Sequence, residues 1–220
     1  MKYSASKENY LKAIFHLQTE SEVVGTNEVA EAMHTRPASV TDMLKKLKKQ
    51  KLLSYERYKG VKLTNEGRKV AIQIIRKHRL WEYFLVEKLQ FGWDEVHEVA
   101  EELEHISSQK LIERLDSFLD FPQTDPHGDP IPDQQGKFNL IPQQNLLDIP
   151  INKPARVCGI ASQTTQMLEL LQHKGINIGT RIEVKRKFPF DNSLELKIRN
   201  QPVTTISEQV AKNILVKDEE

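Results

Sequence analysis

Hydrophobic residues recur every three or four positions near the start of the chain, and this spacing predicts an amphipathic helix within residues 5–20. Its apolar positions are Tyr10, Leu11, Ile14, Phe15 and Leu17. A short helix is predicted next, over residues 27–33, with Thr26 as its N-cap. After the four-residue turn HTRP, a third helix is predicted to open at Ala38 or Ser39. Two helices joined by such a turn are typical of a helix-turn-helix motif.

Strand-like runs follow at residues 52–58 and 61–64, with a turn at Lys59 and Gly60 between them. A hairpin in this place completes a winged helix-turn-helix. Apolar residues then return to helical spacing, and a long helix is predicted from Arg68. Two shorter helices, over HEVAEELEH and SQKLIERLDSFL, complete a helical block that ends near residue 120.

Residues 121–150 interrupt this periodicity, because six of the ten prolines of the chain lie here. Such a run excludes a helix or a central strand, and we interpret it as a tether with extended stretches. Beyond it, ARVCGI, TRIEVKRKF, LELKIRN and QPVTTIS alternate as short strands, and a helix ending at Gly175 lies between the first two. A final short helix and strand close the chain. Several short strands with turn signals predict a small β-barrel.

The predicted fold class is mainly α with small β parts. The predicted domains are a winged helix-turn-helix over residues 1–72, a helical domain over 73–121, the proline-rich tether over 122–150 and an SH3-like β-barrel over 151–220.

In the helical domain, six apolar residues are predicted to form the contact surface of a homodimer, although some of them could belong to the core of one subunit. They are Trp81, Phe84, Leu85, Phe91, Trp93 and Leu111.

The composition describes a soluble globular protein, with 38% apolar and 29% charged residues in 220. No apolar run approaches the roughly 18 residues of a membrane span, so we expect no membrane partner. The single cysteine, Cys158, excludes an internal disulfide and fits a cytoplasmic localisation.

The net charge of +1 conceals two oppositely charged segments. Residues 1–72 carry 14 Lys and Arg against 8 Asp and Glu, a net charge of +6, whereas residues 80–120 carry 3 against 11, a net charge of −8. A basic N-terminal segment favours a polyanionic partner. The acidic segment favours cations, or a solvated helix pair.

The second helix of the helix-turn-helix is the one that enters the major groove of double-stranded DNA. Four residues at its start, Arg36, Ser39, Thr41 and Asp42, are predicted to face base edges. Lys45 and Lys46 farther along, and Arg57 and Lys59 on the hairpin, suit backbone phosphates. The lysine run KKLKKQK alone would more often be the solvated face of an amphipathic helix. Its place beside the turn and the hairpin favours DNA.

The acidic stretch HEVAEELEH places His97, Glu101, Glu104 and His105 on one face of a helix, opposite an apolar stripe. That face is either a solvated row of charges or a metal site. His78 and Glu82, four residues apart, share a face of the preceding helix. Imidazole and carboxylate ligands together suit a divalent ion such as Mn²⁺, Fe²⁺, Co²⁺ or Zn²⁺. Two such sets on neighbouring helices favour the metal.

These motifs resemble those of the DtxR/MntR family of metal-dependent bacterial repressors over nearly the whole chain. The resemblance is carried by SVTDMLKKL, YERYKGVKLTNEG, RKHRLWEYFL, VHEVAEELEHISSQKLIERL, DPHGDPIP and GINIGTRIEV. It implies a homodimer that represses metal-uptake genes when metal is plentiful, with a C-terminal FeoA-type, SH3-like domain. Activation of efflux genes also occurs in this family.

The resemblance also implies two metal sites per subunit. The primary site would use Asn9 of the first helix with Glu101, Glu104 and His105. The ancillary site would use His78, Glu82 and His97. Asp125 and His127 of the tether, and Gln163 and Gln166 of the C-terminal domain, are positions that can complete it.

Four positions depart from the family pattern. One is Asp125, which replaces a cysteine often found in the tether and keeps an oxygen that can bind metal. Glu101 stands where the iron-type members carry cysteine, and a hard oxygen ligand favours Mn(II) over Fe(II). Asn9 replaces the usual aspartate of the manganese type and removes one charge. Lys12 stands where some manganese-type members carry a second acid, which argues against a tight pair of manganese ions.

Two other functions remain as alternatives. A winged-helix regulator of an organic ligand would need a mainly apolar pocket and would bind DNA regardless of chelator. A hydrolytic metalloenzyme is disfavoured, because the chain has no HExxH pairing, no nucleophile motif and no glycine-rich phosphate loop. The sequence therefore predicts a metal-dependent DNA-binding regulator, and not an enzyme.

Overall fold

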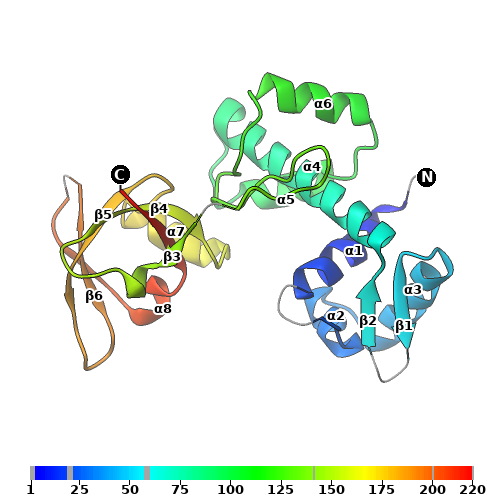
Figure 1. The fold of residues 1–220 in the computed structure, drawn as a ribbon, viewed down its shortest axis with the longest axis horizontal. Coiled ribbons are helices and arrows are strands. Elements are labelled where there is room, and N and C mark those ends of the chain that lie inside the picture. The colour runs from blue at the N-terminus through cyan, green and yellow to red at the C-terminus, as the bar shows by residue number, and fades with distance from the viewer. Residues whose placement is uncertain (1–2, 19–21, 57–59, 141, 200, 220) are drawn as a thin grey trace. The chain divides into compact units, whose positions relative to one another are not determined.

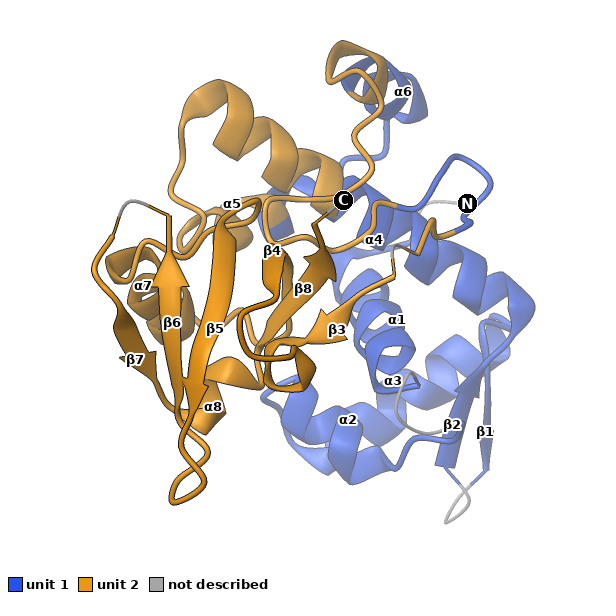
Figure 2. Cartoon of the chain, turned by 60° about the vertical axis from the view of Figure 1, so that its left-hand side comes forward, with its two compact units in different colours: residues 1–78, 101–115, 132–137 blue, residues 79–100, 116–131, 138–220 orange. Residues whose placement is uncertain are grey.

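The computed structural model describes residues 3–18, 22–56, 60–140, 142–199 and 201–219. The chain divides into two compact units (Figures 1 and 2). Unit 1 comprises residues 1–78, 101–115 and 132–137, and unit 2 comprises residues 79–100, 116–131 and 138–220. None of the helices in the described part of the chain is long and apolar enough to cross a membrane.

Unit 1 begins with the predicted winged helix-turn-helix. Its elements are α1 (Ala5–Leu17), α2 (Thr26–Ala32), α3 (Pro37–Lys49), β1 (Leu53–Glu56) and β2 (Gly60–Leu63). The two strands pair antiparallel, with Leu53 opposite Leu63. Leu11 and Ile14 of α1 are fully buried, so the apolar face predicted for this helix forms part of the core, together with the fully buried Leu44 of α3.

Three helices begin one to three residues before their predicted starts. Thr26 is the first residue of α2, whose N-cap is Gly25. Helix α3 begins at Pro37, since proline needs no hydrogen-bond partner for its nitrogen in the first turn. Helix α4 (Asn65–Leu89) begins three residues before the predicted Arg68, because the Thr64 hydroxyl accepts the Gly67 N–H at 3.1 Å.

The helical block contains α4, α5 (Val96–Leu103) and α6 (Gln109–Phe118). Helix α5 is shorter than predicted: it ends at Leu103, and Glu104 and His105 lie in the following turn. The single four-residue face proposed for HEVAEELEH was therefore wrong. Glu104 is completely buried, whereas His97 is exposed.

Unit 2 contains an antiparallel six-stranded sheet in the order β3-β8-β4-β5-β6-β7. The strands are β3 (Gln144–Asn145), β4 (Pro154–Ile160), β5 (Arg181–Lys187), β6 (Leu194–Ile198), β7 (Thr204–Ile206) and β8 (Ile214–Asp218). They are accompanied by the 3₁₀ turn η1 (Leu146–Asp148), α7 (Thr165–His173) and α8 (Glu208–Ala211). Gly175, at φ 66°, ends the predicted helix with a left-handed residue. The predicted fold class is confirmed, including the small C-terminal β domain.

Part of the predicted dimer surface is buried within the chain. Trp81, Leu85 and Trp93 are 9%, 3% and 9% exposed, and Trp93 belongs to the core of the sheet domain. Leu111, in contrast, is 40% exposed. Large aromatic residues fill cores as readily as interfaces, so their presence in the helical block did not identify a contact surface.

Candidate metal centre

The tether folds into an ordered turn around Asp125, instead of the extended stretch predicted there. One carboxylate oxygen of Asp125 accepts the backbone N–H groups of His127 and Asp129, each at 2.9 Å. Gly128 has φ 91°, and a side chain there would meet the Cys158 carbonyl of β4. The His127 carbonyl accepts the Ile160 N–H at 3.0 Å. The turn is therefore fixed to the sheet domain of its own unit.

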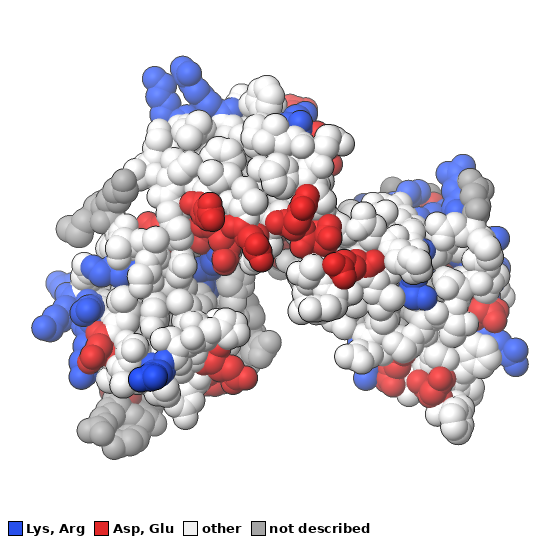
Figure 3. Space-filling model, turned by 180° about the vertical axis from the view of Figure 1, so that it is seen from behind, with Lys and Arg blue, Asp and Glu red and all other residues white. Residues whose placement is uncertain are grey.

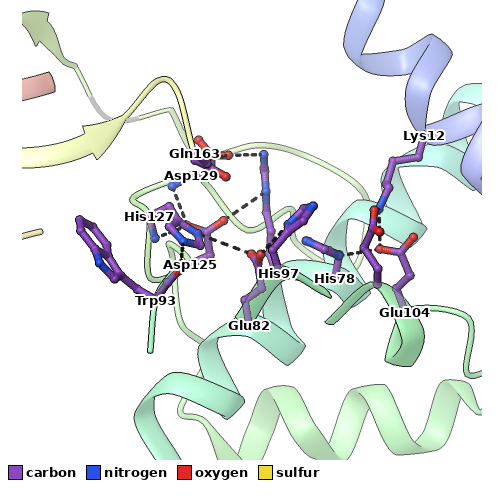
Figure 4. A network of polar contacts seen from close by, with 12 residues as sticks. Lys12, His78, Glu82, Trp93, His97, Glu104, Asp125, His127, Asp129 and Gln163 are labelled. Atoms are coloured by element: carbon purple, nitrogen blue, oxygen red, sulfur yellow. Dashed lines mark hydrogen bonds and ion pairs between the residues drawn. The ribbon is translucent and has the colours of Figure 1, made fainter. Parts of the chain in front are cut away.

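His127 is held in one tautomer. Its Nε2 lies 2.7 Å from the Trp93 carbonyl oxygen, which can only accept, so the ring proton is on Nε2 (Figure 4). The imidazole stacks on the Trp93 ring with centroids 6.0 Å apart. Its Nδ1 is buried without a hydrogen-bond partner and lies 3.9 Å from a carboxylate oxygen of Glu82. A histidine whose second nitrogen donates to a backbone carbonyl has the arrangement found in metal ligands.

Two buried carboxylates face this nitrogen. Glu82 is 2% and Asp125 4% exposed, and ligand atoms of Glu82, Asp125 and His127 all lie within 4.8 Å of one another. Burial raises the pKa of Asp125 well above its ordinary value, and repulsion by Asp129 and Glu82 raises it further. Buried like charges of this kind are stabilised by a cation. The donor atoms therefore fit a divalent metal ion.

Arg79 supplies part of the positive charge and fastens the turn to α4. Its Nε lies 3.5 Å from Asp125, and its two terminal nitrogens donate to the Pro130 carbonyl and to Asp129 at 2.6 and 3.0 Å. We did not predict Arg79 or Asp129. The signal available in the sequence was the position of Arg79 three residues before Glu82, about one helical turn away on the same helix.

Two predicted histidine ligands lie next to Glu82 in different ways. His97 of α5 approaches it with Nδ1 3.2 Å from the second carboxylate oxygen, and its side chain is 54% exposed. His78 precedes Glu82 by four residues on the uninterrupted helix α4, as predicted from the spacing. The carboxylate of Glu82 thus contacts imidazoles from both α5 and the tether.

The two predicted glutamines differ in position. The side-chain amide of Gln163 donates to Asp129 at 3.2 Å and to the Ile160 carbonyl at 3.4 Å, at the edge of the tether turn. Gln166 is an exposed residue of α7. Ligation by either remains a prediction.

The residues predicted for the first-helix site lie in unit 1. The buried Oδ1 of Asn9 has no hydrogen-bond partner. One carboxylate oxygen of Glu104 lies 2.6 Å from His78 Nδ1 and 2.7 Å from the ammonium of Lys12, which also contacts Glu101 at 3.3 Å.

These contacts set the ionisation of the buried acid. Burial raises the pKa of Glu104, but the His78 imidazole and the Lys12 ammonium outweigh burial, and its pKa lies below the ordinary value. His105 contacts Glu8 through Nδ1 at 2.7 Å, and Glu8 was not among the residues we predicted. The carboxylate of Glu104 therefore stays charged, with its charge balanced by Lys12.

The predicted DNA-contacting side chains on α3 are mostly exposed. Arg36, Ser39, Asp42, Lys45 and Lys46 are exposed, whereas Thr41 is half-buried. Arg57 and Lys59 lie outside the described residues. The acidic residues Glu98, Glu101 and Glu102 of α5 are also exposed, and Figure 3 shows a large group of Asp and Glu side chains on the face that it presents. The structure thus keeps the charge asymmetry of the sequence at the surface.

Three family models match the chain in sequence order. Residues 2–61 match the N-terminal DNA-binding domain of iron-dependent repressors, and residues 64–133 match the metal-binding and dimerisation domain of iron-dependent repressors. Residues 144–218 match the FeoA domain.

Similar proteins are known from several bacteria. The manganese regulator MntR of Geobacillus kaustophilus is 33% identical over 120 residues, which are 54% of this chain and 84% of MntR. The iron-dependent repressor IdeR of Mycobacterium leprae is 34% identical over 125 residues, which are 57% of this chain and 54% of IdeR. The matched part thus spans about half the length of IdeR.

A manganese-dependent transcriptional repressor solved in complex with manganese superposes with a TM-score of 0.83 at 33% identity, covering 97% of this chain and 100% of that one. The chain belongs to this family of metal-dependent repressors. Its three matched segments correspond to the winged helix-turn-helix, the helical block with the tether turn, and the six-stranded sheet domain of the family member described here.

Proposed function

We propose that this family member is a metal-dependent DNA-binding transcriptional repressor that responds to Mn(II) in preference to Fe(II) and controls genes of metal-ion homeostasis. The observation that carries the proposal is the buried trio Glu82, Asp125 and His127. We call this trio, with His97 beside it, the tether site. His78, Gln163 and Gln166 remain predicted additional ligands.

The tether site fits a metal ion for two reasons. Nδ1 of His127 is a hydrogen-bond acceptor without a described partner, and a buried acceptor without a partner is costly unless a proton donor or a metal ion binds its lone pair. The two carboxylates repel each other across at most 4.8 Å, and a divalent cation would turn that repulsion into attraction. A bound metal would hold α4 and the tether turn together.

The donor set supports manganese as the preferred ion. Two carboxylates and one imidazole are hard and borderline ligands, and the tether presents Asp125 where a thiolate would favour softer ions. Iron(II) accepts the same ligands, so selectivity is expected to be a preference and not an exclusion.

The regulatory step would be a linkage between metal binding and DNA binding. A homodimer must hold its two recognition helices about one DNA turn apart. If metal favours the arrangement that satisfies this spacing, metal and operator DNA strengthen each other's binding by the same factor. The exposed Arg36, Lys45 and Lys46 would then contact base edges and phosphates.

One cavity bears on the organic-ligand alternative. A cavity of about 320 Å³ in unit 1 is lined by Ile106 and Ile112, but its other lining residues are polar. They are Glu8, Gln73, Lys77, Ser107 and Gln109. Apolar ligand pockets are lined mainly by hydrophobic side chains, so this cavity does not match that expectation.

The test is retention of a promoter fragment of the protein's own gene by the full-length protein. It compares chelator with buffered Mn²⁺, Co²⁺, Zn²⁺ and, under anaerobic conditions, Fe²⁺. We expect retention with metal only, and loss of the metal effect in His127→Ala. His173→Ala, at an exposed histidine at the end of α7, is the matched control and should behave as the unaltered protein. Tight retention in chelator by all three proteins would refute the proposal.

A further inference from the structure

A lysine lies where a metal ion would join the first helix to the acidic segment. The ammonium of Lys12, on α1, is 2.7 Å from Glu104 and 3.3 Å from Glu101 (Figure 4). All three residues belong to unit 1. Its side chain is 13% exposed, and that of Glu104 is completely buried. This is not the exposed ion pair that contributes little to stability, because one partner is cut off from water.

The position of the ammonium conflicts with a metal ion on the same ligands. A carboxylate ligand lies roughly 2.0–2.2 Å from a transition metal ion, and the Lys12 nitrogen is already 2.7 Å from that oxygen of Glu104. A divalent ion bound there would face a like charge at close range. The ammonium therefore competes with a metal ion for this oxygen, Oε2, of Glu104. The other oxygen, Oε1, is buried without a hydrogen-bond partner and lies 3.7 Å from His105 Nε2.

The charges around Glu104 are also too few for both cations. Glu8, Glu101 and Glu104 bring three negative charges, and the ammonium groups of Lys12 and Lys77 balance two of them. Asn9, whose buried Oδ1 is without a hydrogen-bond partner, is neutral. His105, the remaining predicted ligand, contacts Glu8 through Nδ1 and lies 3.7 Å from Glu104 through Nε2. A divalent ion added to this set would leave an excess of positive charge next to a buried residue.

We infer that Lys12 is the resident cation of the first-helix site and that the chain binds one metal ion per subunit, at the tether site. The inference rests on the proposed function of the tether site. It differs from the two sites per subunit that the sequence predicts. Lys12 keeps α1 attached to Glu101 and Glu104 in the absence of metal, so the metal signal enters only through the tether.

The test counts Mn²⁺ bound to the full-length protein at saturation, by electron paramagnetic resonance of free Mn²⁺ and by elemental analysis. We expect one ion per subunit in the unaltered protein and two in Lys12→Glu, which replaces the ammonium with a ligand. Lys7→Met, a change to another lysine of α1, should keep one ion. Two ions in the unaltered protein, or one ion in a folded Lys12→Glu, would overturn the inference.

Further variants keep the result interpretable. Lys12→Met removes the ammonium without adding charge, and it should also bind two ions. It tests the inference if Lys12→Glu fails to fold. Without metal, Lys12→Met should have a lower melting temperature than Lys12→Arg, and Mn²⁺ should raise the melting temperature of Lys12→Met again. Equal melting temperatures of the two metal-free variants would count against the inference. His127→Ala should bind no ion, and Lys12→Glu combined with His127→Ala one. An ion bound to the single variant His127→Ala would show that the tether site had been wrongly proposed, independently of whether Lys12 occupies the first-helix site.

Discussion

Replacing Glu82 by glutamine should stabilise the metal-free protein while removing its response to metal. Ligand oxygens of Glu82 and Asp125 lie within 4.8 Å, and two unit charges at that distance repel by about 3 kcal/mol at an effective dielectric constant of about 20. We therefore expect a gain of up to about 3 kcal/mol. For a chain of this length the melting temperature would rise by up to roughly 10 °C.

The assay is thermal unfolding, followed by circular dichroism, in chelator and in Mn²⁺. In the unaltered protein, free metal at about 100 times Kd should add about 2.7 kcal/mol of stability, and this increment should be absent in Glu82→Gln. Glu87→Gln, an exposed glutamate of the same helix, should change neither value. A lower melting temperature in chelator combined with an intact metal increment would show that Glu82 is structural and would refute the reasoning.

Three further predictions use other parts of the molecule. The pKa of Asp125 is raised in the folded state, so the metal-free protein should lose stability as pH rises from about 3.8 through the folded pKa. Over the same range the Mn²⁺ affinity, measured by calorimetry, should rise. Asp125→Asn should show neither trend. Lys46→Ala should weaken operator binding and reduce the slope of log affinity against log salt by about 1, whereas an unchanged slope would place Lys46 away from the phosphates. Gly128→Ala, whose added carbon would meet the Cys158 carbonyl, should lower Mn²⁺ affinity at least tenfold, and Gly179→Ala, at a similar φ but in open space, should not.

The fold followed from the sequence where periodicity controls structure. The buried face of α1 was predicted from apolar spacing, and the short strands of the sheet domain were predicted from alternation and turn signals. Helix ends were not, because they depend on single groups such as the Thr64 hydroxyl, which caps α4. The early end of α5 moved Glu104 from a solvated face into the interior, and helical periodicity contains no information about where a helix stops.

The candidate metal centre was only partly predictable. The spacing of His78 and Glu82 suggested a shared face on α4, but Asp125 and His127 came from the resemblance to a family. The group that fixes His127 is the backbone carbonyl of Trp93. Every residue carries such a carbonyl, so no residue type marks it in the sequence. The ion pair of Lys12 with Glu104 joins residues that are 92 positions apart and required the folded chain.

The measurement that tests the central claim most directly is the linkage between metal and DNA. Operator affinity would be measured by fluorescence anisotropy with and without saturating Mn²⁺, and Mn²⁺ affinity by calorimetry with and without operator. Linkage requires that the two ratios agree, and we predict that both exceed ten in the unaltered protein and fall to one in His127→Ala. Ratios of one in the unaltered protein would show that metal does not control DNA binding and would contradict the proposed function.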